Sequence, residues 1–386
     1  MAALLLALIY VSFVSLGLPD ALLGAAWPVM HQQLQVPLSY AGAISLIIAA
    51  GTVVSSLMSD RLTKWLGPGK VMVISVAMTA TALFGFSVSP SFWLLCLWAI
   101  PYGLGAGSVD AALNNYVAIH YASRHMSWLH CMWGIGASVG PYIMGAALTG
   151  GLSWNSGYRI ISLLQIVLTA VLMLSLPMWK GNATASADGS RPKSLSLKQI
   201  VAIPGAREVM LAFFCYCGLE QTAILWSSTY FVLRDGMDAE LAATLGSIYL
   251  VGLTVGRGLN GFLTYKFNDT NLIRMGQGLM AAGILVMLLP LGLWSSIAGL
   301  LMIGLGSAPV YPCIIHSTPA HFGEENSQAI IGVQMASAYI GICALPPVFG
   351  LIANHITVAL LPWYLAAILG LMVLMYERLN RLCGEV

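Results

Sequence analysis

The sequence predicts an all-α membrane protein of twelve transmembrane helices, arranged as two six-helix halves that repeat each other in parallel. Three observations predict it: an apolar composition, a series of apolar runs long enough to cross a bilayer, and small residues that recur at one offset. Hydrophobic residues make up 59% of the chain and charged residues 8%, against about 45–50% and about 25% in a soluble domain. This composition indicates an integral membrane protein.

Each helix is predicted from an apolar run of about 18 residues or more, which spans about 30 Å of hydrocarbon. The runs cover residues 3–30, 38–59, 70–88, 92–120, 127–150, 158–179, 208–233, 240–264, 272–289, 291–315, 327–353 and 356–376. The first run starts beside Met1 without a basic segment or a small-residue cleavage pattern, so we interpret it as a retained helix and not a signal peptide.

The distribution of Lys and Arg predicts the orientation. If both termini are cytoplasmic, thirteen of the sixteen basic residues lie in cytoplasmic loops, and Arg159 and Arg234 lie outside. This asymmetry agrees with the positive-inside rule. The net charge of +2 therefore reflects topology and indicates no nucleic-acid partner. The predicted location is a plasma membrane of the bacterial inner-membrane type.

The seven cysteines show no paired spacing, so neither a disulfide framework nor a metal site is predicted. The sequence also offers no combination of nucleophile and base, and no set of metal ligands. We therefore expect no cofactor and no enzymatic activity.

A polar stretch divides the chain into two halves. The predicted domains are residues 1–180, a cytoplasmic linker over 181–206 that is rich in Gly, Ser and charged residues, and residues 207–386. At an offset of 201 residues the two halves share small and apolar residues. The matches are Gly17-Leu18 with Gly218-Leu219, Gly51 with Gly252, Leu62-Thr63 with Leu263-Thr264, and Gly103-Leu104-Gly105 with Gly304-Leu305-Gly306.

Two parallel six-helix repeats resemble the major facilitator superfamily. The resemblance implies a binding site near the middle of the membrane between the halves, and alternating access by rocking of one half on the other. The loop SDRLTKWLGPGK (59–70) resembles the acidic-basic signature of that superfamily. We expect Asp60, Arg61 and Lys64 to form a charge network for gating or structure, with a solvated turn as the alternative.

Acidic residues away from the ends of the predicted helices are few and fall on three of them. Asp20, Asp110 and Glu220 lie on the first, fourth and seventh helices, which the resemblance places around the central cavity. Desolvation favours the neutral form of a carboxyl group, so these residues are the candidates for proton coupling. The alternative for Asp110 is a structural hydrogen bond or a pair with Arg257. We expect Arg257 to pair with Glu220 as a structural or gating charge.

A closer resemblance is to the fucose permease family of sugar–proton symporters. GSVDAALN (107–114) resembles its fourth helix, FCYCGLEQTAILWSSTYF (214–231) its seventh and VGLTVGRGLNGFL (251–263) its eighth, while GLPDALLGAAWP (17–28) places an aspartate, Asp20, on the first. The chain departs from the family at Asn115, where proline is frequent, and in having Asp110 where glutamate is commoner. The resemblance implies Asp20 and Asp110 in proton coupling and in recognition of sugar hydroxyls.

A sugar site needs amides and acids for the hydroxyls, and aromatic faces for the C–H side. Asp110 and Asn114 are one helical turn apart and face the same side. The full set of substrate-binding candidates is Asp110, Asn114, Trp133, Gln165, Gln221, Trp226, Asn260, Tyr311 and Gln334. The alternative is that aromatic residues pack or face lipid and that single amides bond helix to helix.

The predicted function is proton-coupled symport of a monosaccharide or a related small polar solute by a monomer, with the lipid bilayer and protons as its other partners. The main alternative is an exporter or flippase of amphipathic compounds or lipids. A channel and a non-transporting sugar sensor are further alternatives.

Overall fold

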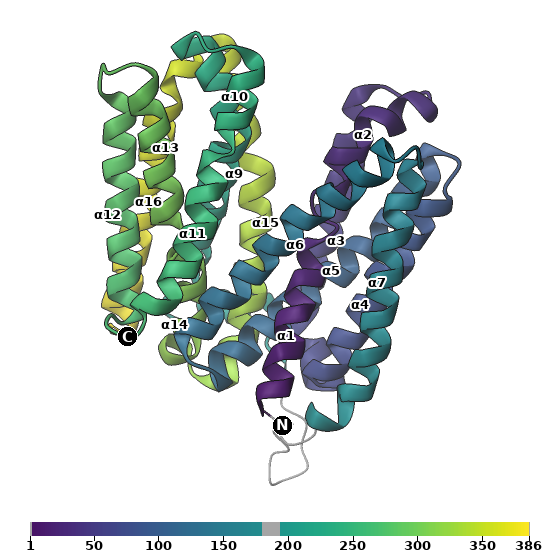
Figure 1. The fold of residues 1–386 in the computed structure, drawn as a ribbon. Coiled ribbons are helices and arrows are strands. Elements are labelled where there is room, and N and C mark those ends of the chain that lie inside the picture. Colours follow the sequence, from purple (N-terminus) through teal and green to yellow (C-terminus); the bar gives the residue numbers. More distant parts are fainter. Residues whose placement is uncertain (1, 180–193, 386) are drawn as a thin grey trace. The chain divides into compact units, whose positions relative to one another are not determined.

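The computed structural model describes residues 2–179 and 194–385, and this part of the chain is helical with no β-strand (Figure 1). The helices are α1 (Ala2–Gly17), α2 (Leu22–Gln33), α3 (Ala41–Leu66), α4 (Pro68–Val88), α5 (Phe92–His120), α6 (Ser123–Thr149), α7 (Trp154–Ser175), α8 (Leu197–Ala202), α9 (Ala206–Asp235), α10 (Ala239–Gly246), α11 (Ile248–Leu263), α12 (Asp269–Leu288), α13 (Leu293–Ser307), α14 (Val310–Phe322), α15 (Glu324–His355) and α16 (Leu361–Cys383). Short 3₁₀ turns cover Leu38–Tyr40, Leu176–Trp179 and Val358–Leu360.

The membrane-spanning helices confirm the predicted fold class. Within the described residues, eleven helical segments are long and apolar enough to cross a bilayer, and α11 is a shorter apolar helix that with α10 covers the predicted eighth span. Large apolar side chains are exposed along them, such as Leu174 at 82% and Trp294 at 78%. Such exposure is expected where lipid, and not water, surrounds the helix.

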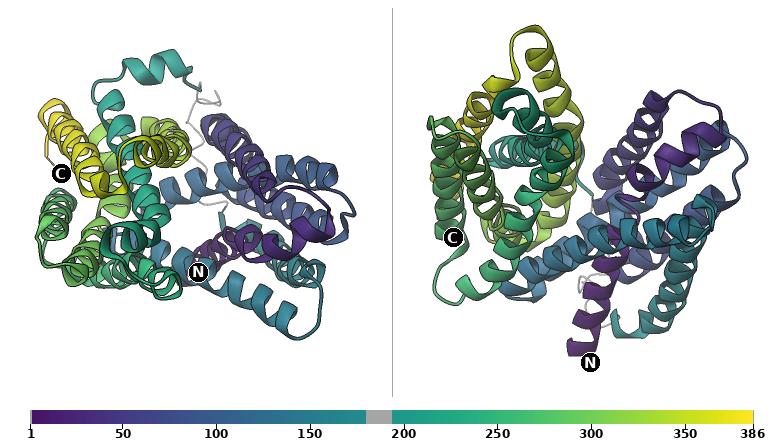
Figure 2. Two further views of the ribbon diagram at one scale, coloured as in Figure 1. Left: turned by 90° about the horizontal axis from the view of Figure 1, so that it is seen from above. Right: turned by 45° about the horizontal axis from the view of Figure 1, so that its top comes forward.

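The chain forms two compact units. The N-terminal unit comprises Met1–Tyr116 with Leu129–Leu195, and the C-terminal unit comprises Val117–Trp128 with Ser196–Val386. In the N-terminal unit α4 packs along α7, and in the C-terminal unit α12 packs against α13 and α16 (Figure 2). Residues 181–193 of the predicted linker lie outside the described part of the chain. The remainder of the linker contains α8, which the sequence does not predict and which a Ser196–Gln199 capping box starts.

The repeated glycines form equivalent helix contacts in the two units. In the N-terminal unit, a Cβ added at Gly103 of α5 would lie 2.3 Å from the carbonyl oxygen of Ile48 in α3. In the C-terminal unit, a Cβ at Gly304 of α13 would lie 2.3 Å from the carbonyl oxygen of Tyr249 in α11. Both contacts join positions that differ by the same offset of 201. The repeat in the sequence is therefore a repeat of close helix packing.

The predicted first and tenth spans are each broken into two helices. The first changes from α1 to α2 across Leu18–Ala21, and the tenth from α13 to α14 across Ala308 and Pro309. Each break contains a proline, Pro19 or Pro309, which has no N–H to donate to the carbonyl four residues earlier. The predicted eighth span is also interrupted, at Ser247 between α10 and α11.

A side chain of α7, Gln165, stabilises the break in the first span. Pro19 cannot bond to the carbonyl oxygen of Ser15, and that oxygen instead accepts a hydrogen bond from Nε2 of Gln165 at 2.9 Å. The side-chain oxygen of Gln165 accepts one from Thr79 at 2.8 Å. Because an unpaired carbonyl in hydrocarbon costs several kcal/mol, the Gln165 amide makes the break tolerable inside the membrane.

Glycines bring α6 against the broken span. A Cβ added at Gly136 would lie 2.0 Å from the carbonyl oxygen of Val14, and one at Gly140 would lie 1.9 Å from that of Leu18. A Cβ at Gly17 would lie 2.2 Å from the carbonyl oxygen of Trp133. Only residues without a side chain permit this approach, and it sets Trp133 beside the segment that carries Asp20.

Candidate functional site

The predicted polar residues of the N-terminal unit gather where α5 and α6 pass the break between α1 and α2. Asp20 lies in the break itself, where Pro19 ends the helical hydrogen bonding. Its Oδ2 accepts a hydrogen bond from Nε1 of Trp133 at 2.8 Å, and its Oδ1 accepts one from the Tyr102 hydroxyl at 3.3 Å. The Asp20 side chain is exposed.

Asp110 belongs to a second chain of hydrogen bonds in the same unit. Nδ2 of Asn114 donates to Oδ1 of Asp110 at 2.8 Å and to its backbone oxygen at 3.0 Å. Oδ1 of Asn114 lies 3.0 Å from Nε2 of His130, so that nitrogen donates. Asp110 is half-buried, whereas Asn114 and His130 are buried. Asp110 and Asn114 thus face the same side of α5, as their one-turn spacing predicts, and are hydrogen-bonded to each other.

The two aspartates lie in the same unit, each in its own group of hydrogen bonds. Neither forms an ion pair with Lys or Arg among the described residues. We name Asp20, Tyr102, Asp110, Asn114, His130 and Trp133 the N-terminal cluster.

The C-terminal unit holds a separate cluster around Glu220. Oε2 of Glu220 lies 3.7 Å from Nη2 of Arg257 in α11 and accepts a hydrogen bond from Tyr216 at 2.6 Å. The Tyr216 hydroxyl also lies 3.0 Å from the carbonyl oxygen of Ser307, at the break between α13 and α14. Arg257 is 4% exposed, and a buried guanidinium needs a carboxylate beside it. The structure thus brings Glu220 and Arg257 together, as the sequence predicts.

Several candidate binding residues bond helix to helix. Gln334 is fully buried and exchanges hydrogen bonds with Thr318 in α14. The Gln165 side chain is also hydrogen-bonded through both its nitrogen and its oxygen, at the break in the first span. Nδ2 of Asn260 donates to Ser127 at 2.8 Å, also in a buried setting. These amides occupy the interhelical positions that the alternative interpretation describes.

The other candidates lie at partly exposed positions of the C-terminal unit. Trp226 donates through Nε1 to the carbonyl oxygen of Pro346 at 3.0 Å and packs edge-on against Phe349. Tyr311 donates to the sulfur of Met335 at 3.1 Å. Gln221 is half-buried on α9, next to Glu220. These side chains leave part of their surface accessible.

The charges of the predicted gating loop lie near the end of α3. Asp60 is buried and pairs with Lys64 one turn later, with Nζ 3.0 Å from Oδ1. Arg61 is exposed. The pair of Asp60 and Lys64 forms part of the expected network.

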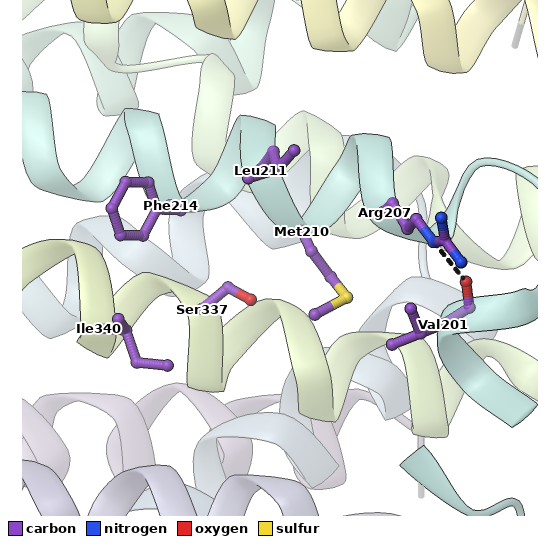
Figure 3. A pocket seen from close by; sticks show the side chains of 7 residues that line it. All are labelled: Val201, Arg207, Met210, Leu211, Phe214, Ser337 and Ile340. Atoms are coloured by element: carbon purple, nitrogen blue, oxygen red, sulfur yellow. Dashed lines mark hydrogen bonds between the residues drawn. The ribbon is translucent and has the colours of Figure 1, made fainter. Parts of the chain in front are cut away.

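A cavity of about 280 Å³ in the C-terminal unit lies apart from these polar residues (Figure 3). It is lined by Val201, Arg207, Met210, Leu211, Phe214, Ser337 and Ile340. Nε of Arg207 donates to the carbonyl oxygen of Val201 at 3.2 Å. Among the described residues, no group of three His, Cys, Asp or Glu side chains could hold a metal ion.

Tyr102, Tyr249 and His130 are not among the site residues predicted from the sequence. Tyr249 donates to the Ser307 hydroxyl at 2.9 Å and so joins the Glu220 cluster. A weak signal existed for Tyr102, since it stands eight residues before Asp110 and so lies two turns away on the same helix. Tyrosine is nevertheless common in apolar helices, so the spacing alone does not single it out.

Similarity to known proteins agrees with this architecture. Residues 9–346 match the family model of the Major Facilitator Superfamily. A yeast protein from Saccharomyces cerevisiae, Bypass of stop codon protein 6, is 21% identical over 282 residues, which cover 67% of this chain and 56% of the yeast protein. The matched region therefore spans little more than half the length of that relative.

Solved structures show the same fold. The superfamily transporter FucP in its outward conformation matches with a TM-score of 0.78 at 18% identity, covering 96% of this chain and 98% of that chain. Another FucP structure is described as the E. coli fucose:proton symporter. The proton:xylose symporter XylE matches with a TM-score of 0.77 at 12% identity, covering 96% and 94% of the two chains. The human organic anion transporter TETRAN matches with a TM-score of 0.70 at 15% identity, covering 97% and 98%. The resemblance inferred from the sequence is confirmed.

Proposed function

The chain belongs to the major facilitator superfamily, and on that premise we propose that it is a secondary active transporter that couples a monosaccharide or related small polar solute to protons. The supporting observation is the N-terminal cluster, in which Asp20 is exposed at a helix break and accepts hydrogen bonds from Tyr102 and Trp133, while Asp110 accepts one from Asn114. A charge at the centre of a bilayer costs at least about 2.5–3.5 kcal/mol. Two carboxyl groups without a basic partner are therefore best explained by a function that uses them.

The chemistry of the cluster suits a sugar and a proton together. Asp20 already accepts hydrogen bonds from Trp133 and Tyr102, and sugar hydroxyls can replace or extend these bonds because each hydroxyl both donates and accepts. The indole of Trp133 offers an apolar face for the C–H side of the ring. A proton on Asp20 or Asp110 removes a charge from the site and so makes its movement across the membrane cheaper.

The transport cycle that follows has four steps. Asp20 or Asp110 takes up a proton from outside, the sugar binds between the halves, one half rocks on the other, and proton and sugar leave on the inside. Trp226, Gln221 and Tyr311 supply contacts from the second half. Glu220 with Arg257, and Asp60 with Arg61 and Lys64, act as structural or gating charges.

The topology is part of the proposal. Both termini are cytoplasmic, the membrane is a plasma membrane of the bacterial inner-membrane type, and the protein works as a monomer. Residues 1–180 and 207–386 are the moving halves, joined by the linker at 181–206. The asymmetric distribution of Lys and Arg supports this orientation.

The test is proton uptake into proteoliposomes on addition of each member of a hexose and pentose panel. External alkalinisation with at least one sugar, lost in Asp110→Asn and kept in Glu324→Gln, is the expected result. Glu324 is an exposed carboxylate at the start of α15, which makes it the matched control. Folded protein that gives no proton signal with any sugar would contradict symport and favour an exporter or flippase of amphipathic compounds. The fold does not decide between these, because the human organic anion transporter shares it.

A further inference from the structure

The connection between α5 and α6 packs with the C-terminal unit. Val117–Trp128, the last residues of α5 and the first of α6, belongs to that unit, whereas Phe92–Tyr116 and Leu129–Thr149 of the same helices belong to the N-terminal unit. A segment that leaves its own helices to join another unit needs specific contacts there. We call Val117–Trp128 the docked segment.

Asp269, the first residue of α12, binds the docked segment. Its Oδ1 accepts a hydrogen bond from the Ser123 hydroxyl at 2.5 Å, and its Oδ2 lies 2.5 Å from Nδ1 of His316 in α14. The other ring nitrogen of His316, Nε2, lies 3.1 Å from the backbone oxygen of Tyr121. Asp269 is only 7% exposed. The carboxyl group and the imidazole therefore bridge the docked segment to α12 and α14.

The two contacts of the His316 ring require one proton more than a neutral imidazole and a carboxylate hold together. The carbonyl oxygen of Tyr121 can only accept, so Nε2 of His316 must carry a hydrogen. A neutral histidine has then no hydrogen on Nδ1, and a bare nitrogen lone pair would face a carboxylate oxygen of Asp269. The contact is satisfied when one additional proton sits between Nδ1 and Oδ2, either on the imidazole or on the carboxyl group.

Packing and polar contacts surround this pair on the docked segment. Ser127 accepts from Asn260 at 2.8 Å, and the guanidinium of Arg124 lies 5.2 Å above the ring of Tyr265. Trp128 packs edge-on against Phe262. These contacts to α11 and the turn after it do not depend on a proton.

Other titratable or charged groups face the pair. Cys313 and His321 of α14 and Tyr376 of α16 interact electrostatically with Asp269. Arg124 and His125 lie on the docked segment itself. His316 links the Asp269 carboxyl group to the backbone of the docked segment.

The docked segment sits between the residues of the N-terminal cluster in the sequence. Asp110 and Asn114 precede it on α5, with Asn114 only three residues before Val117. His130 and Trp133 follow it on α6, with His130 two residues after Trp128. The docked segment is therefore continuous in sequence with both helices that carry residues of the N-terminal cluster.

We propose that Val117–Trp128 is a proton-dependent latch, docked on the C-terminal unit when His316 and Asp269 share one proton and released when that proton is lost. The docked state binds one proton more than the released state. Docking is therefore strongest at low pH and weakens as pH rises, by at most about tenfold per pH unit. This site is distinct from Asp20 and Asp110, and it works whatever solute the protein carries.

Hydrogen exchange of the full-length protein in lipid nanodiscs, without sugar, tests the latch separately from transport. Amide protection factors of 117–128, corrected for intrinsic exchange, should fall by up to about tenfold per pH unit as pH rises above about 6.5, the ordinary pKa of histidine. His316→Gln keeps an amide donor but cannot titrate, so its protection should be low and independent of pH. His355→Gln, at an exposed end of α15, is the matched control and should behave as the wild type.

Two outcomes would overturn the latch. One is a wild-type segment whose protection is independent of pH, and the other is the same pH dependence in His316→Gln. If His316→Gln does not fold, Ser123→Ala tests docking through Asp269 instead. It removes one hydrogen bond between the docked segment and Asp269 and leaves the contact between His316 and Asp269 in place. That variant should lower protection at every pH and keep the pH dependence; unchanged protection would count against docking through Asp269.

Discussion

Alanine at Gly136 tests the close contact that sets α6 against the broken first span. The added Cβ would lie 2.0 Å from the carbonyl oxygen of Val14, whereas a carbon and an oxygen in contact lie about 3.3–3.6 Å apart. The two helices must therefore separate by roughly 1.3 Å. The bond between Trp133 and Asp20 measures 2.8 Å, and a shift of this size is enough to break it.

The expected cost is that of overpacking, about 1–3 kcal/mol. Gly145→Ala is the matched control on the same helix, because a Cβ there meets no atom within 4 Å. Alanine at Gly145 should be neutral or stabilise by up to about 1 kcal/mol, since glycine is the weaker helix former. Thermal unfolding of the two variants and the wild type in one detergent measures the difference. A Gly136→Ala protein that melts at or above the temperature of Gly145→Ala would show that α6 does not pack this closely against Val14.

Three further predictions concern the hydrogen bonds around the two clusters. Gln165→Leu leaves the freed carbonyl of α1 unpaired and should destabilise the fold by about 1–3 kcal/mol, which thermal unfolding measures; an unchanged midpoint would contradict its role at the break. Trp133→Phe removes the donor to Asp20 and should lower proton-driven uptake about tenfold with little change in melting, and unaltered uptake would exclude the indole from the site. Glu220→Gln takes the carboxylate away from the buried Arg257 and should cost about 3–5 kcal/mol; the double variant with Arg257→Gln should recover part of that loss in melting experiments, and additive losses would show that the two charges are not coupled.

The transmembrane helices could be predicted because bilayer thickness sets the minimum length of an apolar run, and such a run can be recognised from the residues alone. The repeat could also be predicted, since the glycines at 51, 103, 252 and 304 are where two backbones approach. The breaks within the first, eighth and tenth spans could not be predicted from the sequence. Proline is tolerated within membrane helices when another group satisfies the freed carbonyl, and Pro28, Pro101 and Pro141 lie inside continuous helices.

The candidate site was predictable where charge or local spacing carried the signal. Asp110 with Asn114 follows from one helical turn, and Glu220 with Arg257 follows from the rarity of charges in these helices. The contacts of Asp20 with Tyr102 and Trp133 join residues 82 and 113 positions apart. Such contacts depend on tertiary packing. The same holds for Gln165, because an amide beside a cavity and an amide that bonds a broken helix look alike in the sequence.

Comparing sugar accumulation driven by a pH gradient with sugar counterflow shows whether the N-terminal cluster carries the coupled proton. Counterflow needs binding and alternation but no net proton movement. We expect the wild type to perform both, and at least one of Asp20→Asn and Asp110→Asn to keep counterflow while losing accumulation. If both variants instead accumulate sugar as the wild type does, neither carboxyl group carries the coupled proton.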